Sequence, residues 1–427
     1  MSSKHLKKPN TDKASRKPEA PPKEPKAKKE KPAKPASPKK VDFKPALTEE
    51  EKKSRKDARI SRRDTVGAIV TLAAAIILFV ATIVIWFYQD SFHEDDLILS
   101  TVTAAVAEDE YIFDAGSGQV FASAGQGLAV ANSTGFELLD STGSVAASKL
   151  MQMDNPAIAA CDSYAVFYDI GGTNIAAARF DGTIQPLSVE GDILSATVST
   201  GGYLAVTTEA TGYRALVTVY NAELSPVYQW YSSSAWVISA TVSPDNRKLA
   251  VLSYTVSGSE VRLFSLSATE QQAAFSVADK VLLDVHWFSS SRLCAYTTGQ
   301  VFFFSSDGQW QDTYSFSDQY LIGCADDGAG FITFALSPYR TGTTSVLVSL
   351  DENGKTLGTA DLQSGIVSMT ASGDQVLVLC ADGALLFSET LTEKGRITGL
   401  PGFKYGLLRS RGEALLIASN YAEVYKF

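Results

Sequence analysis

Cysteine and histidine are scarce in this sequence of 427 residues, with four of the first and three of the second. The four cysteines are widely spaced and include no Cys-x-x-Cys pair. They are Cys161, Cys294, Cys324 and Cys380. We therefore expect buried single thiols, and neither a disulfide-stapled domain nor a zinc site. The histidines are equally dispersed, which argues against a multi-histidine metal site.

Motifs that carry enzymatic chemistry are also lacking. The sequence has no Gly-x-Ser-x-Gly hydrolase module and no glycine loop that could cradle phosphate. The segment 305–310 (SSDGQW) approximates one sialidase box, but no second copy follows. Acidic pairs such as Asp326-Asp327 lack the spacing of a calcium-binding loop. We therefore predict that the protein is not an enzyme and holds no cofactor and no metal.

Positive charge is concentrated at one end of the chain. Residues 1–64 carry 22 Lys and Arg against 10 Asp and Glu, a net charge of +12. Residues 89–427 carry the remaining 16 and 37, a net charge of −21. Such an asymmetry around the first hydrophobic segment predicts that the basic side stays in the cytoplasm.

One long hydrophobic run separates these two parts. It spans residues 66–88 (VGAIVTLAAAIILFVATIVIWFY) and contains no charged residue. At about 1.5 Å per residue, a helix of this length crosses a hydrocarbon core of about 30 Å. The residues expected to set its topology are Arg62 and Arg63 at one end and Trp86, Phe87 and Tyr88 at the other. We predict an uncleaved signal-anchor helix over 65–89 in the plasma membrane, with the C-terminal part extracellular.

The region before the run divides into two segments. Residues 1–47 are Lys- and Pro-rich with few apolar residues, which predicts a disordered cytoplasmic tail. Anionic lipid headgroups are one expected partner of this tail, and a simple solvated spacer is the alternative. Nucleic acid is not expected, because no aromatic residue stands among the lysines to stack on bases. Thr48-Glu49-Glu50-Glu51 forms a capping box, which predicts a juxtamembrane helix over 48–64.

Beyond a linker at 90–110, short β-rich runs recur over 111–427 at a nearly fixed period. Eight small apolar strands are centred on residues 129, 165, 205, 250, 295, 333, 378 and 416. Their mean spacing is about 41 residues, which is typical of the four-stranded blade of a β-propeller. We predict an all-β propeller with eight four-stranded blades, and seven blades remain the alternative.

The two ends of this array predict how the ring closes. The eighth unit ends with a strand at 422–427 and lacks an outer strand, whereas an unassigned strand, 111–113, precedes the first unit. Pairing of 111–113 with 423–426 completes the last blade and hides two sheet edges.

One stretch carries a recognisable repeat signature. Residues 243–250 (SPDNRKLA) resemble the Ser-Pro-Asp-Gly-Lys-x-Leu-Ala turn and strand of WD40-like repeats, with Asn246 in place of the usual glycine. The whole layout is similar to an uncharacterised family of Gram-positive bacterial proteins. These have a basic Pro-rich tail, one membrane span and an exported WD40-like or PQQ-like propeller. The resemblance implies an architecture and no activity.

The most suggestive polar pair of the exported part is Asp284 and His286. They lie in an expected inner strand, where alternation places both on one face. They are candidates for lining the central channel, and a hydrogen-bonded structural pair is the alternative. From these features we predict a cell-surface platform that binds an extracytoplasmic protein partner. A ligand sensor or enzyme with its site at the channel mouth is the second hypothesis.

Overall fold

The structure is a computed structural model that describes residues 110–427, apart from 269, 327–329, 342 and 411. The predicted tail (1–47), juxtamembrane helix (48–64), membrane span (65–89) and all but the last residue of the linker therefore lie outside the described residues. Within the part that is described, no helix is long and apolar enough to cross a bilayer.

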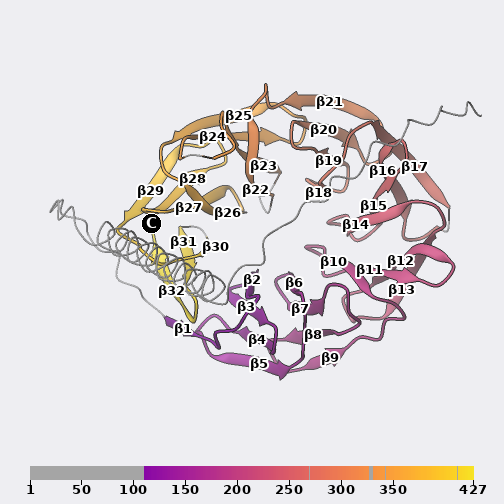
Figure 1. Ribbon diagram of the computed structural model, residues 1–427, viewed down its shortest axis with the longest axis horizontal. Helices are drawn as coiled ribbons and strands as arrows, with labels where there is room; N and C mark the ends of the chain where they lie inside the picture. The colour runs from indigo at the N-terminus through magenta and orange to yellow at the C-terminus, as the bar shows by residue number, and fades with distance from the viewer. Residues whose placement is uncertain (1–109, 269, 327–329, 342, 411) are drawn as a thin grey trace, which may run out of the picture. The chain divides into compact units, whose positions relative to one another are not determined.

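Eight four-stranded antiparallel sheets form a ring, which confirms the prediction of eight blades over the alternative of seven (Figure 1). Blades 1 to 4 comprise β2 (Val120–Ala124), β3 (Gly127–Asn132), β4 (Gly135–Leu139), β5 (Val145–Leu150); β6 (Pro156–Ala160), β7 (Tyr164–Asp169), β8 (Ile175–Arg179), β9 (Ile184–Pro186); β10 (Ile193–Val198), β11 (Leu204–Ala210), β12 (Tyr213–Tyr220), β13 (Pro226–Ser232); and β14 (Trp236–Val242), β15 (Lys248–Thr255), β16 (Gly258–Ser265), β17 (Gln271–Ala278). Blades 5 to 7 comprise β18 (Asp284–Trp287), β19 (Arg292–Tyr296), β20 (Gln300–Ser305), β21 (Trp310–Ser315); β22 (Tyr320–Ala325), β23 (Phe331–Ser337), β24 (Ser345–Asp351), β25 (Thr356–Leu362); and β26 (Ile366–Ser372), β27 (Gln375–Cys380), β28 (Gly383–Ser388), β29 (Glu393–Thr398).

Blade 8 joins the two ends of the array. It contains β30 (Tyr405–Ser410), β31 (Glu413–Ile417), β32 (Tyr421–Lys426) and, as its outer strand, β1 (Glu110–Ile112). Glu110 pairs with Glu423 and Ile112 with Tyr421, so the predicted closure is confirmed with a register nearer the start of β32. Closure removes the two free edges that an open array would expose.

The predicted repeat centres all fall in the second strand of a blade. Residues 129, 165, 205, 250, 295, 333, 378 and 416 lie in β3, β7, β11, β15, β19, β23, β27 and β31, and each is fully or almost fully buried. These strands are apolar on both faces because each is covered by a neighbouring blade on either side. Eight buried clusters result, one at each interface between adjacent blades. The core of the propeller is thus a ring of clusters and has no single centre.

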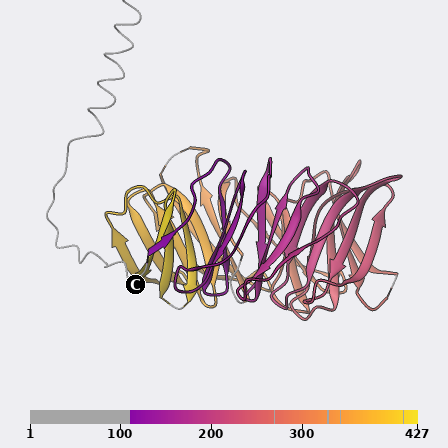
Figure 2. The ribbon, with the colours of Figure 1, turned by 90° about the horizontal axis from the view of Figure 1, so that it is seen from below.

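The first strand of each blade lies nearest the axis and the fourth lies outermost, as Figure 1 shows. Figure 2 shows the ring in profile, with the strands running between its two rims. The hairpins that join strands one and two, and strands three and four, lie at one rim of the ring. We call it the hairpin rim. The hairpins between strands two and three lie at the opposite rim, together with the links between blades. We call this the connection rim.

The WD40-like turn explains why asparagine can replace glycine. Asn246 has a left-handed φ of 57°, a conformation that asparagine tolerates better than most residues. Its side chain also bonds to the neighbouring blade, since Ser199 Oγ donates to Asn246 Oδ1 (2.7 Å) and Nδ2 donates to Gly201 O (2.9 Å). A glycine at this position would lose both contacts between blades.

Candidate functional site

Asp284 opens the inner strand β18 and faces a polar, partly enclosed space. Its Oδ1 accepts hydrogen bonds from Ser239 Oγ (3.2 Å) and from the backbone N–H of Val285 (2.8 Å). Burial raises the pKa of Asp284 to about 6; the Val285 bond opposes this shift and the charge of Asp326 adds to it. Asp284 is therefore a carboxyl group that changes charge close to pH 6.

His286 lies two residues along the same strand and is less well satisfied. Its Nε2 is buried and has no hydrogen-bond partner among the described residues, while its ring meets Phe288 edge to face at 4.9 Å between centroids. Burial lowers the pKa of His286, and the negative charge of Asp326 opposes that shift. Both effects leave His286 as an imidazole whose Nε2 lacks a hydrogen-bond partner among the described residues.

Asp284 and His286 line one cavity of about 550 Å³, to which blades 3, 4, 5 and 6 all contribute. Asp326, just after β22, lies in its wall as well. The nearby thiols are unsuited to nucleophilic chemistry, because burial raises the pKa of both Cys294 and Cys324 well above the ordinary range. No set of three potential metal ligands gathers here or elsewhere in the described residues.

All four cysteines are free, and the prediction of buried thiols is right for two of them and wrong for the other two. Cys294 and Cys380 are buried, whereas Cys161 and Cys324 are only half-buried. The other predicted functional residues, Arg62, Arg63, Trp86, Phe87 and Tyr88, lie outside the described part of the chain.

A surface that sequence analysis did not identify occupies the connection rim. Nineteen large hydrophobic side chains are exposed in the described residues, and all but three lie at this rim or in the half of a strand next to it. The sixteen are Ile112, Leu150, Ile170, Tyr213, Tyr231, Trp236, Ile238, Tyr254, Val256, Val281, Leu283, Tyr320, Ile322, Tyr339, Val367 and Tyr405. The three at the hairpin rim are Val145, Val227 and Trp310. Scattered apolar residues on a surface need no explanation, but a strong bias to one face does.

Part of this bias comes from β-bulges near the start of the inner strands. The register shifts at the same place in β10, β14, β22 and β26, and each time one aliphatic residue is left unpaired. Leu283 holds the corresponding position before β18. These five mouth aliphatics, from blades 3 to 7, are Leu194, Ile238, Leu283, Ile322 and Val367. Together they form an apolar arc at the channel side of the connection rim, in which four are exposed and Leu194 is half-buried against the cluster between blades 3 and 4.

The sequence does contain a signal for this arc. Each mouth aliphatic follows a second aliphatic residue and precedes a small or acidic one, as in Val237-Ile238-Ser239 and Ile366-Val367-Ser368. Two consecutive apolar residues break the strict alternation of a half-buried strand, and an unpaired residue restores it. The doublet therefore recurs at the blade period wherever the inner strand is bulged, although the same pair also fits an ordinary buried strand.

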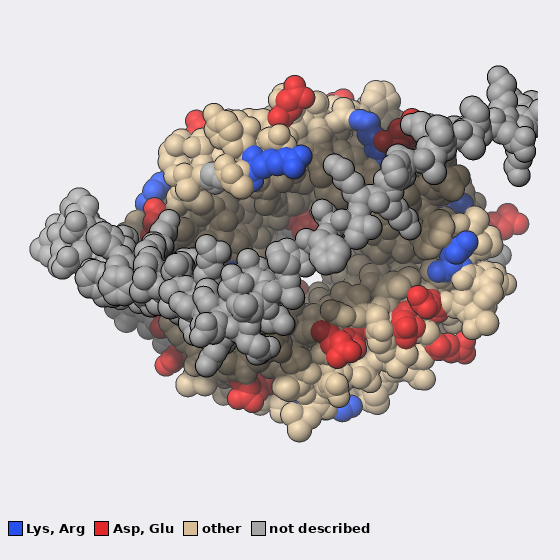
Figure 3. Space-filling model, viewed as in Figure 1, with Lys and Arg blue, Asp and Glu red and all other residues tan. Residues whose placement is uncertain are grey.

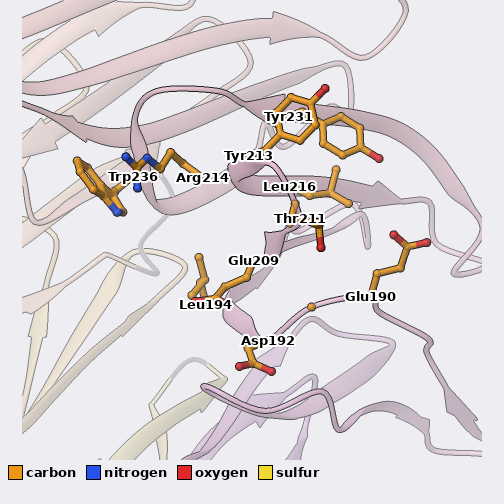
Figure 4. Close-up of a pocket in the computed structure, with 12 residues that line it drawn as sticks. Glu190, Asp192, Leu194, Glu209, Thr211, Tyr213, Arg214, Leu216, Tyr231 and Trp236 are labelled. Carbon is orange, nitrogen blue, oxygen red and sulfur yellow. The ribbon is translucent and has the colours of Figure 1, made fainter.

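Next to the arc, at blade 3, lies a separate pocket of about 740 Å³ (Figure 4). Tyr213, Tyr231 and Trp236 form its aromatic wall, and Glu190, Asp192 and Glu209 supply carboxylates. Figure 3 shows that the ring is hollowed at its centre and that acidic side chains gather where the strands of blades 2 and 3 lie. An aromatic and acidic pocket on an exposed rim is suited to recognition, since large rings bury area at low entropic cost.

Several solved structures share the fold at low sequence identity. BamB from Moraxella catarrhalis aligns with a TM-score of 0.50 and 14% identity over 76% of this chain and 100% of that chain. The C-terminal WD40 domain of Sif2 aligns with a TM-score of 0.54 and 9% identity over 76% of this chain and 98% of that chain. At such identities the similarity shows the fold alone. No curated protein matches the sequence at a significant level.

A family model described as a family of unknown function, DUF5711, matches residues 101–394. The match covers blades 1 to 6 and most of blade 7. Because the model spans well over half of the sequence, this chain belongs to the DUF5711 family.

Proposed function

We propose that this protein is a membrane-anchored, extracytoplasmic β-propeller that binds a protein partner through its connection rim. The observation that carries the proposal is the uneven distribution of exposed apolar side chains between the two rims. A rigid closed ring fixes those side chains in place, so little conformational entropy is lost on binding. Clustered exposed aromatic and aliphatic residues are what the centres of protein interfaces use.

The membrane part of the proposal rests on the sequence. The uncharged run at 66–88, with Arg62 and Arg63 before it, supports a single-pass anchor whose N-terminus is cytoplasmic. The propeller then lies outside the plasma membrane. Its excess of acidic residues keeps it soluble and favours partners of opposite charge.

A second candidate function has one specific observation in its favour. The channel cavity brings together Asp284, Asp326 and the unpartnered Nε2 of His286, an arrangement that a small hydrogen-bonding ligand would satisfy. In this alternative the protein is a ligand sensor, or an enzyme, with its site at the channel mouth. A small molecule retained by the purified protein and lost in a His286→Ala variant would favour it.

Site-specific photo-crosslinking in intact cells tests the rim proposal. The chain offers a matched pair of exposed indoles, with Trp236 on the connection rim (50% exposed) and Trp310 on the opposite side (63% exposed). A photoreactive amino acid in place of Trp236 should capture a discrete protein, whereas the same group at Trp310 should not. Equal capture at both positions, or none at either, would contradict the proposal.

The topology needs its own experiment. Protease added to whole cells should degrade the acidic C-terminal part and leave the N-terminal tail protected. If the propeller became cleavable only after lysis, the extracytoplasmic location would be wrong.

A further inference from the structure

The acidic and aromatic pocket on blade 3 allows the chemistry of the partner to be specified. It is built from four separate segments of the connection rim: the link 190–192 before β10, the turn from β11 to β12, the end of β13 and the start of β14. Two of these segments belong to strands β13 and β14, and a third is the tight turn 211–212 between β11 and β12. The link is fastened to the end of β11, because the N–H of Glu209 donates to Asp192 O, so the pocket is preformed.

Two tyrosines form the upper wall of the pocket as drawn in Figure 4. The rings of Tyr213 and Tyr231 lie 4.8 Å apart at 46°, and both side chains are nearly half exposed. Beside them the guanidinium of Arg214 stacks over the indole of Trp236 at 4.4 Å. Arg214 is the one cation among the twelve residues that line the pocket, and it is already engaged.

The three carboxylates opposite are left without a cation. Glu190, Asp192 and Glu209 are all exposed, and none takes part in the ion pairs found among the described residues. The backbone holds two of them together, because the N–H of Glu209 donates to Asp192 O at 2.8 Å. The residue between Glu190 and Asp192 must be glycine, since a Cβ at Gly191 would lie 2.2 Å from Glu209 O. Three like charges fixed at one end of an aromatic wall favour a positively charged ligand.

The pocket continues into a second cavity of about 410 Å³, which indicates an extended ligand. The two cavities share Glu190, Leu216 and Tyr231 as common wall. The second is lined in part by apolar residues, among them Leu187 and Val189. A free amine would fill only the first cavity, whereas a peptide would fill both.

We propose that this pocket binds a partner protein through an extended segment that carries a lysine or arginine next to an apolar residue. The basic side chain would lie between the tyrosine rings and the carboxylates, and the apolar neighbour would enter the second cavity. Anionic lipid and nucleic acid are excluded as occupants by the fixed negative charge. A second copy of this chain would bring another acidic rim to the pocket. The inference rests on the proposed function of the connection rim, and it names that partner's chemistry.

Selection from a random peptide library displayed on phage, with the purified full-length chain in nonionic detergent as target, tests this directly. Enriched peptides should carry lysine or arginine beside an apolar residue. The affinity of the best peptide should fall about tenfold or more in a Glu190→Gln, Asp192→Asn, Glu209→Gln triple variant. A matched triple at the hairpin rim, Asp162→Asn, Glu223→Gln and Glu270→Gln, changes the net charge equally and should leave affinity within about twofold.

Several outcomes would overturn the inference: enriched peptides without basic residues, no enrichment, or an equal loss in both triples, which would reduce the effect to bulk charge. A dimer of the wild-type chain that dissociates in the pocket triple would assign the site to a second copy. These failures are distinct from failure of the proposed function. A partner crosslinked at Trp236 would remain even if its segment were not cationic, and peptide binding in vitro would remain even if the propeller were not exported.

Discussion

The hairpin rim and the connection rim are made by the same strands, yet they differ in how far the needs of the fold explain their residues. At the hairpin rim, six turns between third and fourth strands repeat one design, in which a residue with positive φ donates its N–H to the carbonyl three residues earlier. These residues are Gly143, Gly182, Leu224, Gly308, Gly354 and Leu391. Backbone geometry accounts for the four glycines, whereas Leu224 and Leu391 are buried and pack in clusters between blades. The fold therefore accounts for all six residues.

Backbone geometry explains some glycines of the connection rim, such as Gly191 and Gly212, but it does not explain the exposed side chains there. Its bulges place aliphatic side chains in solvent, and its pocket holds three carboxylates that no ion pair among the described residues neutralises. Exposed apolar area and fixed like charges both disfavour an isolated folded chain. The fold explains the residues of the hairpin rim but not these side chains of the connection rim. The connection rim is therefore the better guide to function.

Both rims are held in place by the closure of the ring. Deletion of 422–427 removes most of β32, the partner of β1, and opens the cluster in which Tyr111 and Phe113 pack against Ala422 and Val424. Each fully buried large side chain contributes about 1.5–3 kcal/mol, so we expect a loss of more than about 5 kcal/mol. Thermal denaturation of the full-length chain should show no cooperative transition at its original temperature. An unchanged Tm would mean that the ring is held by other contacts.

Two glycines with positive φ, one on each rim, offer a sharper comparison. Gly354 (φ 84°) lies in a tight turn at the hairpin rim, where an added Cβ would lie 2.9 Å from the Phe303 ring. Gly212 (φ 82°) lies at the connection rim with open space around it. Gly212→Ala should cost about 1–2 kcal/mol from backbone strain alone. Gly354→Ala should cost about 1–3 kcal/mol more, because the ring must move.

Urea denaturation of both glycine variants checks this order. Equal losses would show that the crowding around Gly354 relaxes freely. A larger loss at Gly212 would contradict the view that the hairpin rim carries the structural constraints.

The channel mouth predicts a smaller, pH-dependent effect. The pKa of Asp284 is raised to about 6 in the fold, against about 3.9 in an unfolded chain. The folded state therefore binds the proton more tightly. The ionised carboxylate destabilises the fold progressively as the pH rises from about 4 to about 6, and fully above that. Because the side chain of Asp284 is partly exposed, we expect the ionised carboxylate to lower the free energy of unfolding by about 1–2 kcal/mol. This is less than the free energy that corresponds to the whole pKa shift.

Asp284→Asn keeps an oxygen acceptor for Ser239 and Val285 and removes the titration. The variant should be more stable than the wild type at pH 7 and similar to it at pH 4. Unfolding free energies measured between pH 4 and pH 8 test the sign. Identical pH profiles for the two proteins would mean that Asp284 is not destabilised by burial.

The blades could be predicted from the sequence because their second strands have a distinct pattern. These strands are apolar on both faces and recur at the blade period, so eight short runs such as Leu204-Ala205-Val206 were sufficient to count them. Closure was also predictable, because an unassigned strand before the first repeat matched a missing one in the last. Both predictions depend only on the order and spacing of strands along the chain, which can be read from the sequence.

The candidate surfaces depend instead on distances between separate segments. Asp326 influences His286 from the next blade, 40 residues away, and the pocket of blade 3 joins Glu190 to Trp236 across three hairpins. No local pattern gives these distances. The bulges were a different case, since the aliphatic doublets were visible, but each reads equally well as part of an ordinary buried strand.

The smallest effect on stability is expected from the residues that we consider functional. Ile322→Ser with Val367→Ser alters two mouth aliphatics that are 43% and 44% exposed, and Val145→Ser with Val227→Ser alters two hairpin-rim residues that are 51% and 44% exposed. Each pair should shift the unfolding free energy by less than about 1 kcal/mol, since exposed sites contribute little. Only the first pair should abolish the adduct formed by a crosslinker at position 236. If both pairs left that adduct intact, the apolar arc would not be part of the interface; if both removed it, the two rims would not differ in function.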